Sequence, residues 1–156
     1  MSLLDIFRKQ PNDKIKRHLY DKKLIPKLKK EHKILVSYIV KVQKAIKKGD
    51  EKKIKYFLQI LDSQLVKHFM KEDLKLYWYL KNYYKDDAQM LAYIKSFEEN
   101  IKEIQKVVIN FFDTYTHKNA TIDENFYKTF SQIIEALSNR IHSEEKELYT
   151  WYIPCE

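Results

Sequence analysis

The sequence predicts an all-α protein, an antiparallel up-down-up-down four-helix bundle with a short N-terminal extension. The 156 residues suit a single domain. One Gly and three Pro are too few for a β fold with many tight hairpins. Four long segments carry apolar residues in steps of three and four, the spacing of one face of an α-helix. Because the links are short, successive helices should be antiparallel. We assign residues 1–25 to the extension and residues 26–154 to the bundle.

The first predicted helix spans residues 27–47, after an extension that we expect to pack across or beside the bundle and to include a short helix around 13–22. Pro26 suits the first turn of a helix, where its missing N–H is not needed. Gly49 suits the left-handed residue that ends a helix, and Asp50 can cap the helix that follows. The stripe along this helix consists of Leu28, His32, Leu35, Ile39, Val42 and Ile46.

The other three predicted helices span residues 51–84, 87–116 and 123–152. Asp86 and Asp87 form the turn between the second and third helices, a polar loop at 117–123 precedes the fourth, and Pro154 ends it. The stripe of the second helix is Ile54, Leu58, Leu61, Leu65, His68, Glu72, Leu76 and Tyr79. That of the third is Met90, Ile94, Phe97, Ile101, Ile104, Val108 and Phe111. That of the fourth is Phe126, Phe130, Ile133, Leu137, Arg140, Glu144, Leu148 and Trp151.

Composition narrows the function classes. The net charge is +8, but the lysines are interleaved with glutamates along every segment, which is typical of a solvated surface. Nucleic acid is therefore not an expected partner, although residues 14–33 are the most basic segment and could dock an acidic protein. No apolar run is long enough to span a membrane. The start does not read as a secretory signal, and Cys155 is the single cysteine, so we expect a cytoplasmic protein.

Neither a glycine-rich phosphate loop nor a nucleophile constellation can be recognised, so we do not expect an enzyme. The unusual feature is polar side chains on core-facing stripes: His32, the pair His68 and Glu72, and the pair Arg140 and Glu144. Buried polar groups cost several kcal/mol unless they are satisfied, so these residues should meet one another or bind something. Reflecting 68–72 across the turn near residue 86 places Asn100 at the same level of the bundle.

Two stretches that lie 72 residues apart repeat part of this pattern. His68 to Tyr77 reads HFMKEDLKLY, and Arg140 to Tyr149 reads RIHSEEKELY. They share paired carboxylates and a closing Leu-Tyr. They differ at the first position, which is His68 in one stretch and Arg140 in the other.

The sequence resembles the hemerythrin-like (HHE cation-binding) domain over about residues 24–154. The resemblance rests on LKKEHKI at residues 28–34, the Gly49-Asp50 link and HFMKED at residues 68–73. It implies a centre of two non-haem irons, often for binding or sensing oxygen, held by histidines from all four helices together with carboxylates. His32, His68 and Glu72 match that pattern, and Glu144 is kept. The expected histidines of the third and fourth helices fall at Asn100 and Arg140.

The resemblance therefore implies His32, His68, Glu72 and Glu144 as metal ligands, with non-haem iron as the cofactor, in a set so incomplete that one ion or none is bound. Arginine stays protonated and is no ordinary ligand. We expect Arg140 to replace the charge of a metal by bridging Glu72 and Glu144, with His32, His68 and Asn100 completing the hydrogen bonds. In another register of the fourth helix, His142 and Glu147 would be the ligand pair.

A weaker resemblance supports a second function class. FEEN at 97–100, EALSNRI at 135–141 and Glu144-Glu145 are similar to the anti-sigma regulators of the Rsd/AlgQ type, which are metal-free four-helix bundles. The alternative is thus a regulatory protein that acts by contact with a protein partner. The sequence identifies neither that partner nor the oligomeric state.

Overall fold

The computed structural model describes residues 20–155, and in that part of the chain all regular structure is helical. The elements are α2 (Leu24–Lys48), α3 (Glu51–Lys71), the π-helix η1 (Glu72–Tyr77), α4 (Trp78–Tyr83), α5 (Ala88–Tyr115), α6 (Glu124–Lys146) and the 3₁₀ helix η2 (Leu148–Trp151). The all-α prediction is confirmed. The N-terminal extension and its short helix fall almost entirely outside the described residues, and residues 20–23 form no helix.

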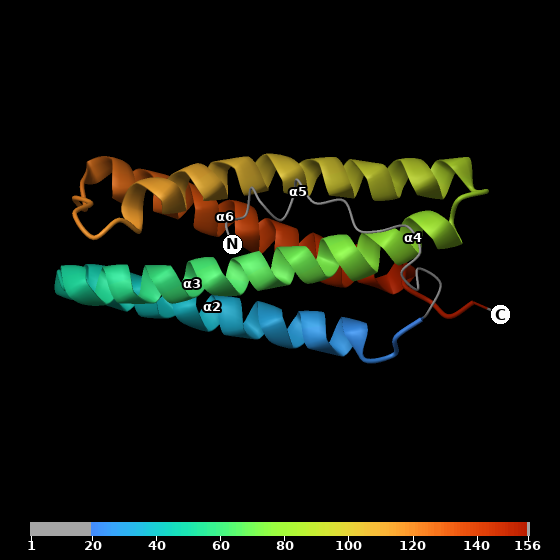
Figure 1. The fold of residues 1–156 in the computed structure, drawn as a ribbon, viewed down its shortest axis with the longest axis horizontal. Helices are drawn as coiled ribbons and strands as arrows, with labels where there is room; N and C mark the ends of the chain where they lie inside the picture. Colours follow the sequence, from blue (N-terminus) through green and yellow to red (C-terminus); the bar gives the residue numbers. More distant parts are fainter. Residues whose placement is uncertain (1–19, 156) are drawn as a thin grey trace.

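Four long rods lie side by side, because α3, η1 and α4 run on as one (Figure 1). Following the colours along the chain, α2 and α5 run in one direction, and α3 and α6 run in the other (Figure 1). This is the up-down-up-down arrangement that short links impose on neighbouring helices.

The helix ends lie where the local sequence favours them. Gly49 ends α2 at φ 66°, in the left-handed region that a residue without a Cβ adopts at little cost. Each of the next three long helices begins at an aspartate whose side chain accepts the backbone N–H three residues later: Asp50 from Lys53, Asp87 from Met90 and Asp123 from Phe126. Such caps satisfy N–H groups that have no partner inside the helix.

Most residues of the four predicted stripes are buried against one another. The exceptions, half-buried at the edge of the core, are Ile46, Met90, Phe97, Ile104 and Trp151. His32, His68, Glu72, Arg140 and Glu144 are buried among these apolar residues, at 2–4% exposure. The polar cluster therefore lies inside the bundle, where each group needs a partner.

Two predicted helices differ from a regular α-helix. The second contains a π-helical segment from Glu72 to Tyr77. The fourth does not continue to residue 152: it ends at Lys146, because Glu147 has a non-helical backbone (φ −121°, ψ −69°), and a 3₁₀ helix follows. Apolar spacing could not predict these changes, because it reports which residues face the core and not how the hydrogen-bond ladder shifts between them.

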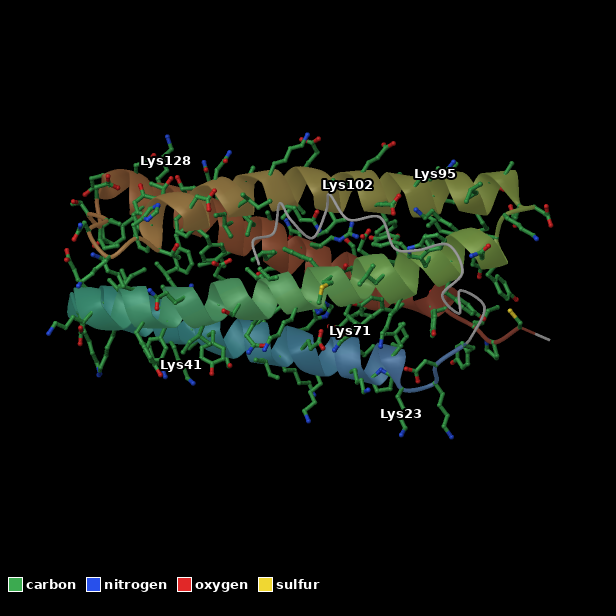
Figure 2. The ribbon with its side chains drawn as sticks, viewed as in Figure 1. Lys23, Lys41, Lys71, Lys95, Lys102 and Lys128 are labelled. Atoms are coloured by element: carbon green, nitrogen blue, oxygen red, sulfur yellow. The ribbon has the colours of Figure 1, made fainter. Side chains whose placement is uncertain are left out.

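The charged surface is spread around the bundle. Labelled lysines lie on each long rod: Lys41 on α2, Lys71 on α3, Lys95 and Lys102 on α5 and Lys128 on α6 (Figure 2). None of the described helices has an apolar stretch long enough to cross a membrane.

Candidate metal centre

Four buried side chains converge from three rods of the bundle. His32 comes from α2, His68 from α3, Glu72 from the first residue of η1 and Glu144 from α6, and each is 2% exposed. Each residue offers one possible ligand atom, and these atoms all lie within 4.8 Å of one another. The four ligand residues expected from the resemblance are therefore brought together.

The two imidazole rings face each other through their Nε2 atoms, which are 3.1 Å apart. His32 Nε2 also lies 3.1 Å from Oε1 of Glu144. His68 Nε2 lies 3.2 Å from Oε1 of Glu72, four residues later on the same rod. Two nitrogens and two carboxylates thus surround one point.

The opposite edge of each imidazole is held by another carboxylate. His32 Nδ1 donates to Oε2 of Glu145 at 2.8 Å. His68 Nδ1 donates to Oε1 of Glu31 at 2.9 Å, and the other oxygen of Glu31 accepts from Lys71. A ring that is neutral, with its hydrogen on Nδ1, can turn the lone pair of Nε2 toward a metal ion. Metal-binding histidines usually have this carboxylate partner, which orients the ring and makes the nitrogen more basic.

Arg140 faces inward, but it does not bridge the two acids as predicted. Its Nε donates to Oε2 of Glu144 at 3.2 Å, whereas its other donors go to the backbone oxygen of Phe97 at 2.9 Å and to the hydroxyl of Tyr77. The guanidinium also lies over the ring of Phe97, 5.1 Å from its centroid. The bridge fails because Tyr77 and the Phe97 carbonyl take the donors that would have reached Glu72.

The remaining predicted residues lie at the surface. Asn100 is exposed on α5, although its Oδ1 accepts a hydrogen bond of 3.2 Å from Arg140. His142 and Glu147, the pair of the alternative register, are both exposed and lie outside the ligand cluster. On α6 the inward position is held by Arg140 and Glu144.

Sequence reasoning missed two tyrosines that enter the cluster. The hydroxyl of Tyr149 donates to Oε2 of Glu72 at 2.9 Å and lies 3.1 Å from Nε2 of His32. The hydroxyl of Tyr77 accepts a hydrogen bond from Arg140, beside the cluster. Both aligned stretches close on Leu-Tyr, but helical spacing alone does not predict that Tyr149 reaches His32 and Glu72 on two other rods.

Burial and charge shift the pKa values of the cluster in the absence of a cation. Burial alone would lower the pKa of His68, but the charge of Glu72 and the hydrogen bond to Glu31 raise it to about 10. Burial would raise the pKa of Glu72, yet His68 holds it at about 2. Burial and then the charge of Glu72 raise the pKa of Glu144 to about 7. One proton on His68 therefore balances Glu72, and Glu144 is only partly ionised at neutral pH.

The donor set fits a metal ion better than it fits a closed hydrogen-bond network. Three polar atoms lie within 3.1 Å of His32 Nε2, although a ring nitrogen has only one N–H or one lone pair to offer. Glu72 Oε1 is buried and has no hydrogen-bond partner among the described residues, although it lies 3.2 Å from His68 Nε2. A cation would satisfy both atoms at once. Imidazole and carboxylate donors suit iron, zinc or manganese.

The comparisons with known proteins agree with this chemistry. Residues 23–152 match the family described as the hemerythrin HHE cation-binding domain. The search of curated proteins and the search of solved structures each found no match. The matched span contains all four long rods and every residue of the cluster. The chain belongs to the hemerythrin HHE cation-binding domain family, and its buried His/Glu cluster is a group of residues that could hold such a cation.

Proposed function

We propose that this protein binds a single metal ion, iron in the first instance, as a binding or sensing protein rather than an enzyme. The observation that carries the proposal is the convergence of His32, His68, Glu72 and Glu144 within 4.8 Å, with both imidazole Nδ1 atoms tied to carboxylates. A single ion follows from Arg140, which stands where the resemblance expects a histidine and carries a charge of its own.

The chain's own residues would prepare the site before an ion arrives. Glu31 and Glu145 orient the two rings, and Arg140 neutralises part of the charge of Glu144. The buried position excludes water, which strengthens every electrostatic interaction inside it. Iron, when bound, would supply the capacity to bind a small ligand and to change oxidation state.

Oxygen binding or sensing is the finer part of the proposal. A cavity beside the cluster has the ligand residues His32, His68 and Glu144 on its wall. The rest of its lining is apolar apart from Arg140, whose charge is paired with Glu144: Leu35, Ile39, Leu65, Phe69, Leu137 and Ile141. Such a lining suits a small uncharged molecule such as dioxygen and not an ionic substrate.

The test is a titration of chelator-stripped protein with Fe(II) under anaerobic conditions, followed by calorimetry and elemental analysis. We expect one equivalent of iron per chain. His68→Ala should weaken binding by at least a hundredfold, because it removes a ligand. His142→Ala is the matched control, since it removes an exposed histidine two residues after Arg140, and it should bind like the wild type.

Two results would count against the proposal. Loss of binding in His142→Ala alone would show that the ligands belong to the other register of α6. A wild-type protein that takes up neither Fe(II) nor Zn(II) would leave the metal-free regulator as the better account of this bundle. In that case the buried cluster would serve stability alone.

A further inference from the structure

We infer that Tyr149 is a fifth ligand of this centre and binds the ion through its phenol oxygen. The inference rests on the proposed function, because it concerns the same ion. It adds a donor of a kind that neither the His/Glu pattern nor the resemblance includes.

The distances are those of donors in one coordination shell. Two neighbouring donors at about 2.1 Å from an ion lie about 3.0 Å apart at a right angle and about 3.4 Å apart at the tetrahedral angle. The Tyr149 oxygen lies 3.1 Å from His32 Nε2 and 2.9 Å from Glu72 Oε2. The separations between the other donors are similar: 3.1 Å between the two Nε2 atoms, and 3.2 Å between His68 Nε2 and Glu72 Oε1. The phenol oxygen therefore belongs to the same set of neighbouring donors.

The backbone of α6 changes course just before this tyrosine. The α-helix ends at Lys146, Glu147 adopts a non-helical conformation, and Tyr149 lies in the 3₁₀ helix η2. A continued α-helix would have placed Tyr149 about 140° around the axis from Glu144, five residues earlier. The break instead leaves Tyr149 with 3% exposure and its ring parallel to that of His32, at 5.6 Å and 12°.

Coordination by Tyr149 replaces an O–H bond with an O–metal bond. The phenol proton leaves for solvent, the electron pair of the O–H bond becomes the donor pair, and no group is oxidised or reduced. An anionic oxygen added to two carboxylates stabilises a trivalent ion more than a divalent one, because the Coulomb attraction grows with the charge of the ion. We therefore expect the centre to retain Fe(III) more tightly than Fe(II).

Tyr77 offers a matched control within the same cluster. It holds the place in the first stretch that Tyr149 holds in the second, and it is also buried, at 2% exposure. Its hydroxyl bonds to Arg140, which is not a ligand. Removing either hydroxyl takes one oxygen from the core, but only the loss of Tyr149 should remove a donor.

The test adds ferric nitrilotriacetate to chelator-stripped protein and records visible absorption and resonance Raman spectra. Phenolate bound to Fe(III) gives a charge-transfer band in the visible range, with ring vibrations enhanced on excitation in that band. We expect both signals in the wild type and in Tyr77→Phe. Tyr149→Phe should lose them completely while still taking up one equivalent of Zn(II) through the other four ligands.

The outcomes separate this inference from the function on which it rests. Iron uptake by the wild type without tyrosine vibrations would overturn the inference and leave the metal site standing. A band that survives in Tyr149→Phe, or that Tyr77→Phe alone abolishes, would overturn it in the same way. If Tyr149→Phe does not fold, the absence of tyrosine vibrations from iron-loaded wild type, or their loss in Tyr77→Phe, would still overturn the inference. A wild type that binds no metal would overturn both proposals.

Discussion

At the scale of single residues, the cluster is organised by which donor reaches which acceptor. The guanidinium of Arg140 donates hydrogen bonds to Glu144, Tyr77 and the backbone oxygen of Phe97. The Glu144 carboxylate therefore has a permanent positive partner. Within residues 20–155, Glu72 has no hydrogen bond or ion pair with a guanidinium, and its partners are His68 and Tyr149. The two acids, equivalent in the aligned stretches, thus have different environments and opposite pKa shifts.

Replacing Arg140 with Met should destabilise the metal-free protein. The change leaves Glu144 and the Tyr77 hydroxyl buried without their shared donor, and breaking a buried pair in this way typically costs roughly 3–5 kcal/mol. The loss should be smaller at pH 5.5 than at pH 7.5, because Glu144, with a pKa of about 7, is then largely protonated. Urea unfolding in EDTA at both pH values measures this. Lys95→Met, at an exposed position of α5, is the control, and an Arg140→Met protein as stable as that control would contradict the account.

Replacing Glu31 with Gln should weaken metal binding without preventing folding. Glu31 holds Nδ1 of His68, and loss of such a partner typically lowers metal affinity about 10–100-fold. Zn(II) calorimetry on the wild type and the variant measures the ratio. Glu98→Gln is the comparison, because Glu98 also pairs with a lysine, Lys81, but touches no ligand histidine. Equal affinities for the two variants would mean that Glu31 does not orient the site.

At the scale of elements, the two aligned stretches end by different departures from the α-helix. The first stretch passes through the π-helix η1, in which Tyr77 is buried. The second leaves the α-helix at Glu147, and Tyr149 is buried in the 3₁₀ helix that follows. A π segment acts as one extra residue in an α-helix, so a residue five positions after Glu72 returns toward the same face. Single-turn π segments are frequent at functional sites. Here the segment begins at a candidate ligand.

Deleting Leu74 should therefore be tolerated. Leu74 is exposed, at 39%, and lies inside η1. Its removal can therefore restore a regular α-helix while the apolar residues before and after η1 still point into the core. Deleting the exposed Lys67 in regular α3 should instead rotate the preceding turns by about 100° and expose their stripe. Circular dichroism and thermal unfolding should show a cooperative transition for the first variant and a much weaker one for the second. Equal damage from the two deletions would contradict this interpretation of η1.

At the scale of the whole molecule, the cluster couples folding to pH. In the folded protein the pKa of Glu144 is raised from 4.5 to about 7, so its stabilising contribution is complete below pH 4.5 and is lost as the pH rises through 7. His68 acts with the same sign, because its pKa is raised from 6.5 to about 10 and its contribution is lost as the pH rises through 10. Glu72 is opposite: its contribution is present above pH 4.5 and is lost as the pH falls toward 2.

The metal-free protein should consequently be most stable near pH 5. Its free energy of unfolding in EDTA should fall by a few kcal/mol between pH 5 and pH 9. Each pKa unit by which folding raises the pKa of Glu144 or His68 corresponds to about 1.4 kcal/mol. Added Zn(II) should reverse the slope, since the ligands must lose protons to bind. Denaturant titrations at pH 5, 7 and 9 measure the stability of the metal-free and of the Zn(II)-loaded protein. Glu144→Gln should flatten the pH dependence of the metal-free protein between pH 5 and 7.5. A rise in metal-free stability from pH 5 to 9 would contradict the proposed proton balance.

Much of this arrangement could be predicted because it depends on local chemistry. The four rods follow from apolar spacing, their ends from Gly49 and the capping aspartates, and the buried polar residues from their places on the stripes. Glu31 and Glu145 could not be predicted as partners of the histidines, because each contacts a ring on another rod. The partners of Arg140 could not be predicted either, since they depend on a neighbouring backbone carbonyl and on the position of Tyr77.

The sequence by itself determined that this protein is a helical bundle and that histidines, carboxylates and one arginine face its interior, because side-chain period and burial are properties of each helix alone. Three facts come from the packing of the rods: four ligand atoms meet within 4.8 Å, Arg140 bonds to Glu144 and not to Glu72, and Tyr149 reaches both His32 and Glu72. Those facts depend on ångström-scale shifts between rods and on breaks in the helical ladder. A pattern repeated every three or four residues carries no information about either.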